Sequence, residues 1–144
     1  LATFAKKLNM NSEEQQIDYE RVINHWIDTS ETDYELMLDV FERRYYSWSL
    51  FHGHIVLERL LKALYVKEHH RHAPFTHNLY RLTELTEIDV PEDYSDWLVT
   101  VTSFNINARY DDYRKEFYNR CTLEYTTLWI ERIKRLRIWI KDKL

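Results

Sequence analysis

Apolar residues recur at three- and four-residue steps along most of the chain, which is the period of helices that bury one face. Ser12 followed by Glu13 and Glu14 is a helix-start signal. The stripe that comes next predicts one long helix over about residues 17–42. Its apolar members are Tyr19, Val22, Ile23, Trp26, Ile27, Tyr34, Met37, Leu38 and Phe41.

The same period predicts further helices after a short joint over residues 43–47. The second helix covers about 47–67, and a loop over 69–76 containing Pro74 separates it from a short third helix over 78–87. Pro91 opens a fourth helix that lasts to about Phe104, and residues 105–112 interrupt the pattern. One long final helix follows, with an expected buried face made of Phe117, Cys121, Tyr125, Leu128, Ile133, Leu136, Trp139 and Ile140. The pattern predicts an all-α, up-and-down bundle of four to five helices.

Composition supports an all-helical chain of one domain. The 144 residues include one glycine and two prolines, too few for the many turns of a sheet protein. This length suits a single domain, so we expect residues 1–144 to form one, with 1–14 as a loosely ordered leader. The chain begins with Leu1 and Met10 offers another start, so the native start is open.

The single cysteine and the absence of a long apolar run indicate where in the cell the protein is expected. Cys121 has no partner for an internal disulfide, which fits a reducing compartment, and we expect the cytoplasm. At helical spacing, Cys121 is predicted to pack as a small buried apolar residue. No apolar run reaches the length that spans a bilayer, so no membrane partner is predicted.

Acidic and basic residues are distributed unevenly. Residues 9–42 hold ten acidic residues and one basic residue, a balance of −9. Residues 114–144 hold nine basic and four acidic residues, a balance of +5. Two explanations stay open: the two helices carry complementary faces, or the basic one offers a face to phosphate.

Three polar residues of the second helix fall in or beside its apolar sector. His54, Glu58 and Lys62 are each four residues apart, so they stack along one helix face. Burying an unpaired carboxylate costs several kcal/mol, and pairing it with His54 or Lys62 offsets much of that cost. The trio is either a structural network or part of a ligand site.

Common catalytic and metal motifs are largely excluded. One glycine cannot supply a Walker loop, a GxGxxG motif or a GxSxG motif. His69, His70 and His72 crowd one loop, but no cysteine pair or HExxH accompanies them, so neither a metal site nor a cofactor is predicted. The segment from Arg109 to Arg114 has cations and aromatic rings at a break between helices, suited to phosphate contact or to caps and salt bridges.

Three segments, taken in order, resemble the HEPN domain. They are Glu58-Arg-Leu-Leu-Lys62-Ala63, His77-Asn78-Leu79 and Ala108-Arg109-Tyr110-Asp111, where the family reads approximately E-x-x-L-K-A, H-N-L and R-Y-P-D. The resemblance covers about residues 17–141 and implies a bundle of four or five helices. The bundle is also similar to the helical domain of kanamycin nucleotidyltransferase.

The resemblance implies partners and a ligand class. HEPN proteins are often homodimers and commonly act beside a minimal nucleotidyltransferase in toxin–antitoxin or defence modules. A module of this kind is expected to bind a nucleotide or an RNA phosphate. Residue by residue, the ligand-binding candidates are Glu58, Lys62, His77, Asn78, Arg109 and Tyr110, with His54, Asp112 and Arg114 as weaker candidates.

Many family members are metal-independent ribonucleases that use R-x4-6-H at the start of the final helix, and this chain departs from that motif. The fifth to seventh positions after Arg109 are Arg114, Lys115 and Glu116. Asp111 also stands where the family often has proline. We therefore assign no catalytic residue and expect a binding module without ribonuclease activity.

Two alternatives remain. Arg71-x5-His77 has the family spacing, but it lies in a loop and is interpreted as chance. A ribonuclease with an altered set would use Arg109 or Arg114 to hold phosphate and His77 or His54 as the base. The other alternative is a structural helical adaptor.

Overall fold

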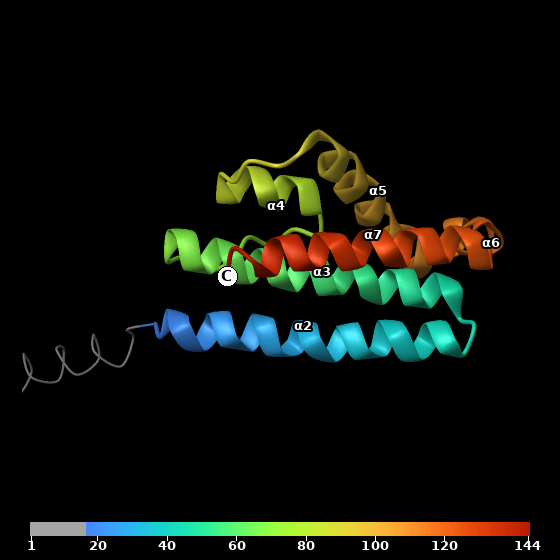
Figure 1. The fold of residues 1–144 in the computed structure, drawn as a ribbon, viewed down its shortest axis with the longest axis horizontal. Coiled ribbons are helices and arrows are strands. Elements are labelled where there is room, and N and C mark those ends of the chain that lie inside the picture. Colours follow the sequence, from blue (N-terminus) through green and yellow to red (C-terminus); the bar gives the residue numbers. More distant parts are fainter. Residues whose placement is uncertain (1–16) are drawn as a thin grey trace, which may run out of the picture.

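The computed structural model describes residues 17–144, and this part of the chain is all-helical, with six helices and no strand (Figure 1). The all-α prediction is therefore confirmed, with more helices than the four to five predicted. The predicted leader over 1–14 lies outside the described residues. The helices are α2 (Tyr19–Glu42), α3 (Tyr46–His69), α4 (Leu79–Thr86), α5 (Glu92–Arg109), α6 (Asp111–Arg120) and α7 (Leu123–Lys141).

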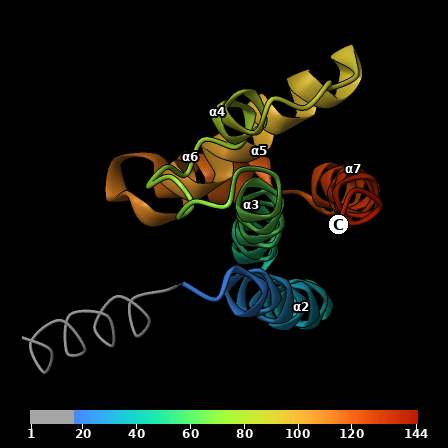
Figure 2. The same ribbon diagram turned by 90° about the vertical axis from the view of Figure 1, so that its left-hand side faces the viewer.

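Helix α3 forms the centre of the molecule, and each of the other five described helices contacts it. In Figure 2, α2 lies on one side of α3, α7 on a second, and the α4–α5 pair on a third. This position follows from the sequence of α3, which is apolar around most of its circumference. Leu57, Leu60, Leu61 and Leu64 are all buried in the shared core.

Small residues let α2 and α7 pack closely against α3. A Cβ atom on Gly53 would lie 2.6 Å from Ile133 Cδ1 and 3.1 Å from Met37 Sδ, so any other residue here would force these side chains to shift where the three helices meet. Nearby, the Ser30 hydroxyl donates across the α2–α3 contact to the Val56 carbonyl at 3.1 Å. The polar atom of this buried serine is thereby satisfied.

The chain after Phe104 differs from the prediction in two ways. The expected interruption over 105–112 is wrong in its length, because Asn105 and Ala108 are buried and extend α5 to Arg109, and the break before α6 is confined to Tyr110. The single final helix is also wrong, because the chain breaks between α6 and α7. The hydroxyl of Thr122 accepts a hydrogen bond from the Tyr125 backbone N–H at 3.2 Å and so caps the start of α7.

The predicted buried faces need two corrections. Leu128, placed on the buried face of the last helix, is 46% exposed. In α2, Met37 alone of the predicted stripe is fully buried, and Trp26 is only partly buried. The reason is that α2 lies at the edge of the molecule and packs mainly on α3.

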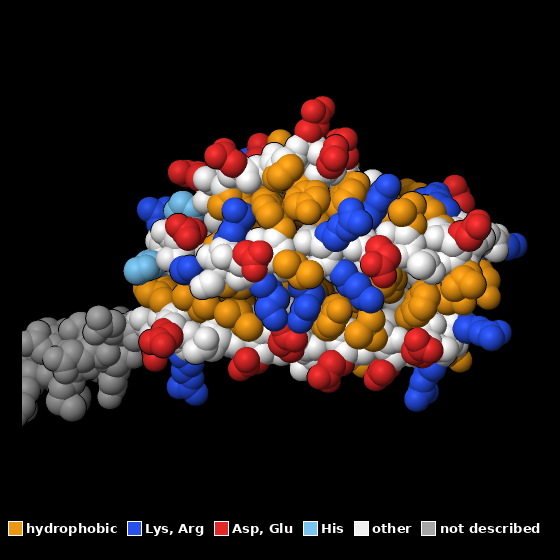
Figure 3. All heavy atoms as spheres, viewed as in Figure 1, with side chains coloured by type: hydrophobic (Ala, Val, Ile, Leu, Met, Phe, Trp, Pro, Cys, Tyr) orange, Lys and Arg blue, Asp and Glu red, His pale blue; other side chains and the backbone are white. Residues whose placement is uncertain are grey.

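An acidic residue of α2 contacts two basic residues of α7. Glu31 on α2 accepts hydrogen bonds from Arg137 at 2.9 Å and from Lys141 at 2.6 Å on α7. Figure 3 shows Lys and Arg side chains beside Asp and Glu side chains along this boundary. At Glu31 the two helices therefore carry complementary charges, as the first explanation expects.

Replacing Glu31 with glutamine is expected to cost at most about 1 kcal/mol of stability near neutral pH, because the cluster is half exposed. The hydrogen bond from Lys141 holds the pKa of Glu31 below its ordinary value of 4.5. A lowered carboxyl pKa stabilises the fold above about pH 4.5, and this stabilisation disappears as the pH falls through the lowered value.

The measurement is thermal melting of wild type and Glu31→Gln from neutral pH to below pH 4, with exposed Glu35→Gln as the control. The gap between wild type and Glu31→Gln should narrow below about pH 4.5. A gap that stays constant over this range would contradict the electrostatic origin.

Candidate functional site

Burial of the polar trio on α3 is confirmed: His54 is fully buried, Glu58 is 8% exposed and Lys62 is 7% exposed. Glu58 accepts a hydrogen bond from Lys62 Nζ at 3.3 Å with one oxygen. The other oxygen bonds to Nδ1 of His77 at 2.7 Å. The buried carboxylate is thus paired with Lys62 and with a loop histidine, and not with His54.

The contact with Glu58 determines which nitrogen of the neutral His77 ring carries the proton. A carboxylate oxygen only accepts hydrogen bonds, so Nδ1 of His77 carries the proton in this contact. In the neutral ring, Nε2 is then the atom without a proton. The His77 side chain is 63% exposed, so this arrangement presents a proton acceptor at the surface.

His54 holds the same loop residue through its backbone. Burial lowers the pKa of His54, so the ring is neutral. Its Nε2 bonds to the His77 carbonyl oxygen at 2.8 Å, which places the proton on Nε2. Nδ1 of His54 then accepts from the Asn105 amide at 3.3 Å. His77 is therefore fixed at its backbone by His54 and at its ring by Glu58.

These residues border a pocket of about 350 Å³ between α2, α3, α5 and the loop before α4. Its wall combines aromatic and apolar side chains with a carboxylate, a histidine, an amide and two arginines. The lining residues are Trp26, Phe51, Ile55, Glu58, Arg59, His77, Asn105 and Arg109. The pocket is thus the place where α3 brings the predicted Glu58, His77 and Arg109 together.

The cations around this pocket differ in their partners. Arg59 pairs with Asp33 at 3.0 Å, and Lys62 pairs with Glu58. Arg109 donates from Nε to the Asn105 carbonyl at 3.4 Å, and within residues 17–144 no carboxylate lies at ion-pair distance from it. Arg109 is therefore the lining cation whose charge is available to an anionic ligand.

One lining residue carries an unsatisfied polar atom. Because Asn105 donates its amide to His54, its Oδ1 is the acceptor that is left over. This atom is buried and has no hydrogen-bond partner among the described residues. Buried side-chain polar atoms in folded proteins nearly always have a partner, so an unpaired acceptor in a pocket wall calls for an explanation.

The other sequence candidates lie around the pocket. The Asn78 side chain caps α4 by accepting from the Arg81 backbone N–H at 3.0 Å. Tyr110 is exposed beside Arg109, whose guanidinium carbon is 5.7 Å from the centre of its ring. Asp112 is exposed in the first turn of α6. None of these three side chains lines the pocket.

Arg114 supports the junction between α5 and α6. It donates to the Arg109 carbonyl oxygen at 3.3 Å, and its guanidinium lies 5.9 Å from the centre of the Trp48 ring. Arg114 therefore places a second positive charge, which is paired with Asp111 at 3.6 Å, near Arg109 without lining the pocket.

Sequence reasoning missed several residues of the site. Asn105 was assigned to an interruption, although its spacing of four from Arg109 puts both on one helix face. Trp26 was interpreted as a core residue of α2. For Phe51 and Arg59 the sequence holds no signal beyond their place on α3, because only tertiary packing brings them to the pocket.

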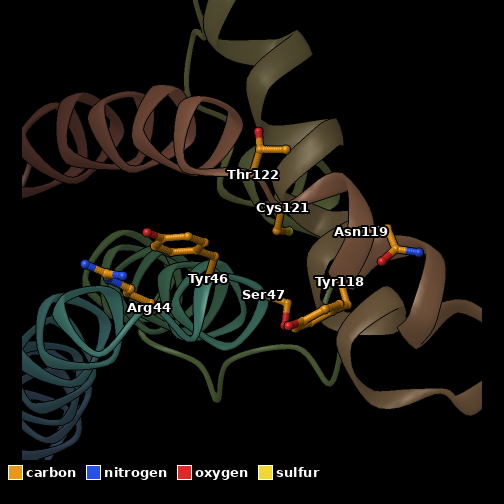
Figure 4. Close-up of a pocket in the computed structure, with 7 residues that line it drawn as sticks. All are labelled: Arg44, Tyr46, Ser47, Tyr118, Asn119, Cys121 and Thr122. Atoms are coloured by element: carbon orange, nitrogen blue, oxygen red, sulfur yellow. The ribbon is translucent and has the colours of Figure 1, made fainter.

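A separate pocket of about 320 Å³ lies near the start of α3 (Figure 4). It contains Cys121, which is buried as predicted. Burial raises the pKa of this thiol to about 12, so the thiol stays protonated and is a poor nucleophile. No sequence-predicted ligand residue lines this pocket, which leaves the pocket with His77 and Arg109 as the candidate site.

The histidines of the predicted loop over 69–76, of which His69 ends α3, make other contacts. His69 Nε2 lies 3.2 Å from the Thr86 carbonyl oxygen, and His70 stacks near Tyr19 with ring centres 5.6 Å apart. Within residues 17–144, no group of three His, Cys, Asp or Glu side chains is placed to hold a metal ion. The described helices also include none that is long and apolar enough to cross a membrane.

The fold and pocket define a class: a helical bundle with an arginine, a histidine and a carboxylate around an aromatic-walled cavity. The model of the HEPN domain family matches residues 23–143. The chain therefore belongs to the HEPN family, as its sequence resemblance indicated. At the family level this makes it a nucleotide- or RNA-binding module.

The fold is similar to a solved structure, the crystal structure of TT1696 from Thermus thermophilus. The TM-score is 0.72 with 18% sequence identity, over 85% of this chain and 98% of that chain. At this identity the similarity shows the fold alone. Among curated proteins, no match to this chain is found.

Proposed function

We propose that this HEPN domain binds the phosphate of a nucleotide or of RNA in the pocket between α2, α3 and α5. The observation that carries the proposal is Arg109, a pocket-lining guanidinium without an ion-pair partner among the described residues. A guanidinium binds phosphate with two parallel hydrogen bonds, and this suits it to phosphate better than a lysine ammonium. His77 lines the same pocket and adds a polar ring.

Replacing Arg109 with alanine is expected to weaken binding of AMP and of a short single-stranded RNA by about tenfold or more, since hydrogen bonds to charged groups contribute about 1.5–3 kcal/mol. Isothermal titration measures the affinities. The matched control is Arg43→Ala, because Arg43 is an exposed arginine at the far end of α2. Equal affinities for wild type and Arg109→Ala, or no binding by wild type, would overturn the proposal.

A second candidate function is metal-independent cleavage of RNA, and the Glu58–His77 contact favours it. With Nδ1 of His77 bonded to Glu58, Nε2 is suited to take the proton of a ribose 2′-hydroxyl. The 2′-oxygen would then attack the phosphorus, the bond to the 5′-oxygen would break, and that oxygen would take up a proton. Arg109 would stabilise the charge on the phosphate oxygens.

The assay for this candidate is incubation of RNA with the protein in the presence of a metal chelator. Products ending in a 2′,3′-cyclic phosphate and a 5′-hydroxyl would support it. Intact RNA at high protein concentration would contradict it and leave binding alone. If binding and cleavage are both absent, the structural adaptor is the remaining hypothesis.

We also propose that the protein forms a homodimer and partners a nucleotidyltransferase in a toxin–antitoxin or defence module in the cytoplasm. Membership of the HEPN family supports the homodimer and the partnership. The single cysteine of the chain supports the cytoplasm. The mass of the purified chain in solution tests the homodimer. Copurification with a nucleotidyltransferase encoded by a neighbouring gene tests the partnership.

A further inference from the structure

An exposed phenylalanine lies close to the candidate site in the sequence and in space. Phe75 is fully exposed in the loop between α3 and α4, two residues before His77. A large apolar side chain held in water contributes little to folding, which separates Phe75 from the core residues of the bundle. Because the His77 ring and backbone are fixed by α3, the loop that carries Phe75 is anchored next to the pocket.

Phe75 borders a second cavity that adjoins the first. This cavity has a volume of about 380 Å³, within the range of small-ligand sites, and is lined by Val22, Trp26, His72, Ala73 and Phe75. Trp26 lines both cavities, so they share one aromatic wall. A ligand with one end in the Arg109 pocket and the other end at Phe75 would pass Trp26.

Trp26 is held by the same network that positions His77. Lys62 Nζ lies 5.5 Å from the centre of the Trp26 ring, and Lys62 is bonded to Glu58. The buried carboxylate of Glu58 thus supports both the histidine of one cavity and the aromatic wall common to both. The two cavities are parts of one structural unit.

We propose that the cavity between Trp26 and Phe75 binds the nucleobase of the ligand whose phosphate is held by Arg109. This inference rests on the proposed phosphate-binding function. Aromatic side chains stack on the flat faces of bases with little sequence preference. Arg71 in the loop between α3 and α4 adds a positive charge near this cavity, which suits an anionic nucleotide.

The test replaces one exposed side chain and compares the affinity of the variant for ligands with a base and without one. For Phe75→Ala, the affinity for AMP is expected to fall about tenfold, and the affinity for ribose 5-phosphate should stay unchanged. Since Phe75 is fully exposed, this substitution removes no core contact. Tyr118→Ala, an exposed aromatic on α6, is the matched control and should leave both affinities unchanged.

A second arm of the experiment distinguishes RNA from free nucleotides as the ligand. It measures the affinity of wild type and Phe75→Ala for a trinucleotide of adenosine and for the same trinucleotide without bases. A base-dependent loss on Phe75→Ala in either arm supports the inference. Equal losses with and without a base, or no loss in either arm, overturn it. If Phe75→Ala gives one of these contradicting results while Arg109→Ala still weakens the binding of every ligand, the base subsite alone has failed. If wild type binds no ligand, the base subsite and the phosphate site have both failed.

Discussion

Replacing Glu58 with alanine is expected to lower the free energy of unfolding by about 3–5 kcal/mol. The substitution leaves the Lys62 ammonium buried without a carboxylate, and it removes the partner of the His77 ring. An uncompensated buried charge is among the most destabilising changes known in protein interiors. Urea unfolding followed by circular dichroism measures the difference, because the helical signal is lost on unfolding.

Removing both charges together provides the control. The double substitution Glu58→Leu with Lys62→Met is expected to restore most of the lost stability, because well-packed apolar side chains often replace buried ion pairs without loss. This variant should still lack the support for His77, so its ligand binding should stay impaired. A loss below about 1 kcal/mol for Glu58→Ala would show that Lys62 is hydrated and that the network is not structural.

The second large effect concerns RNA cleavage. If the chain cleaves RNA, His77→Asn is expected to reduce the rate by about 10²–10⁴-fold, the usual contribution of a general base. Asparagine keeps a polar side chain near Glu58 but cannot take a proton at neutral pH. Single-turnover cleavage of a labelled RNA measures the rate, and titration with a non-cleavable RNA shows whether binding is retained.

His70→Asn is the matched control for His77→Asn, since His70 is another exposed histidine, at the C-terminal end of α3, and lines neither cavity. It should leave the rate within a fewfold of wild type. Equal losses at both histidines would point to a general effect of the loop. An unchanged rate in His77→Asn would assign the base to another residue.

The helices illustrate which parts of the fold follow from local patterns. Helices α2 and α3 were predicted with their ends within about three residues, because each carries apolar residues at helical spacing over six turns or more. The break before α7 was missed because it depends on one cap, the hydroxyl of Thr122. The apolar period continues across that break, so periodicity did not indicate it.

The candidate site was predictable where its contacts are local. Glu58 and Lys62 are four residues apart on one helix, so their pairing follows from helix geometry. The bond between Glu58 and His77 joins residues nineteen positions apart, and it depends on the path of the loop. Sequence spacing gave no reason to choose His77 over His54 as the partner of the buried carboxylate.

By itself, the sequence determined the helical class, the long apolar second helix and the charged trio on that helix. It determined these because helical period, charge and i to i+4 spacing are properties of neighbouring residues. Tertiary structure alone decided that Trp26 of α2, Phe51 of α3 and Arg109 of α5 surround one cavity, and that Phe75 stands at a second. These residues meet because separate helices pack on α3, and packing between distant segments leaves no periodic trace along the chain.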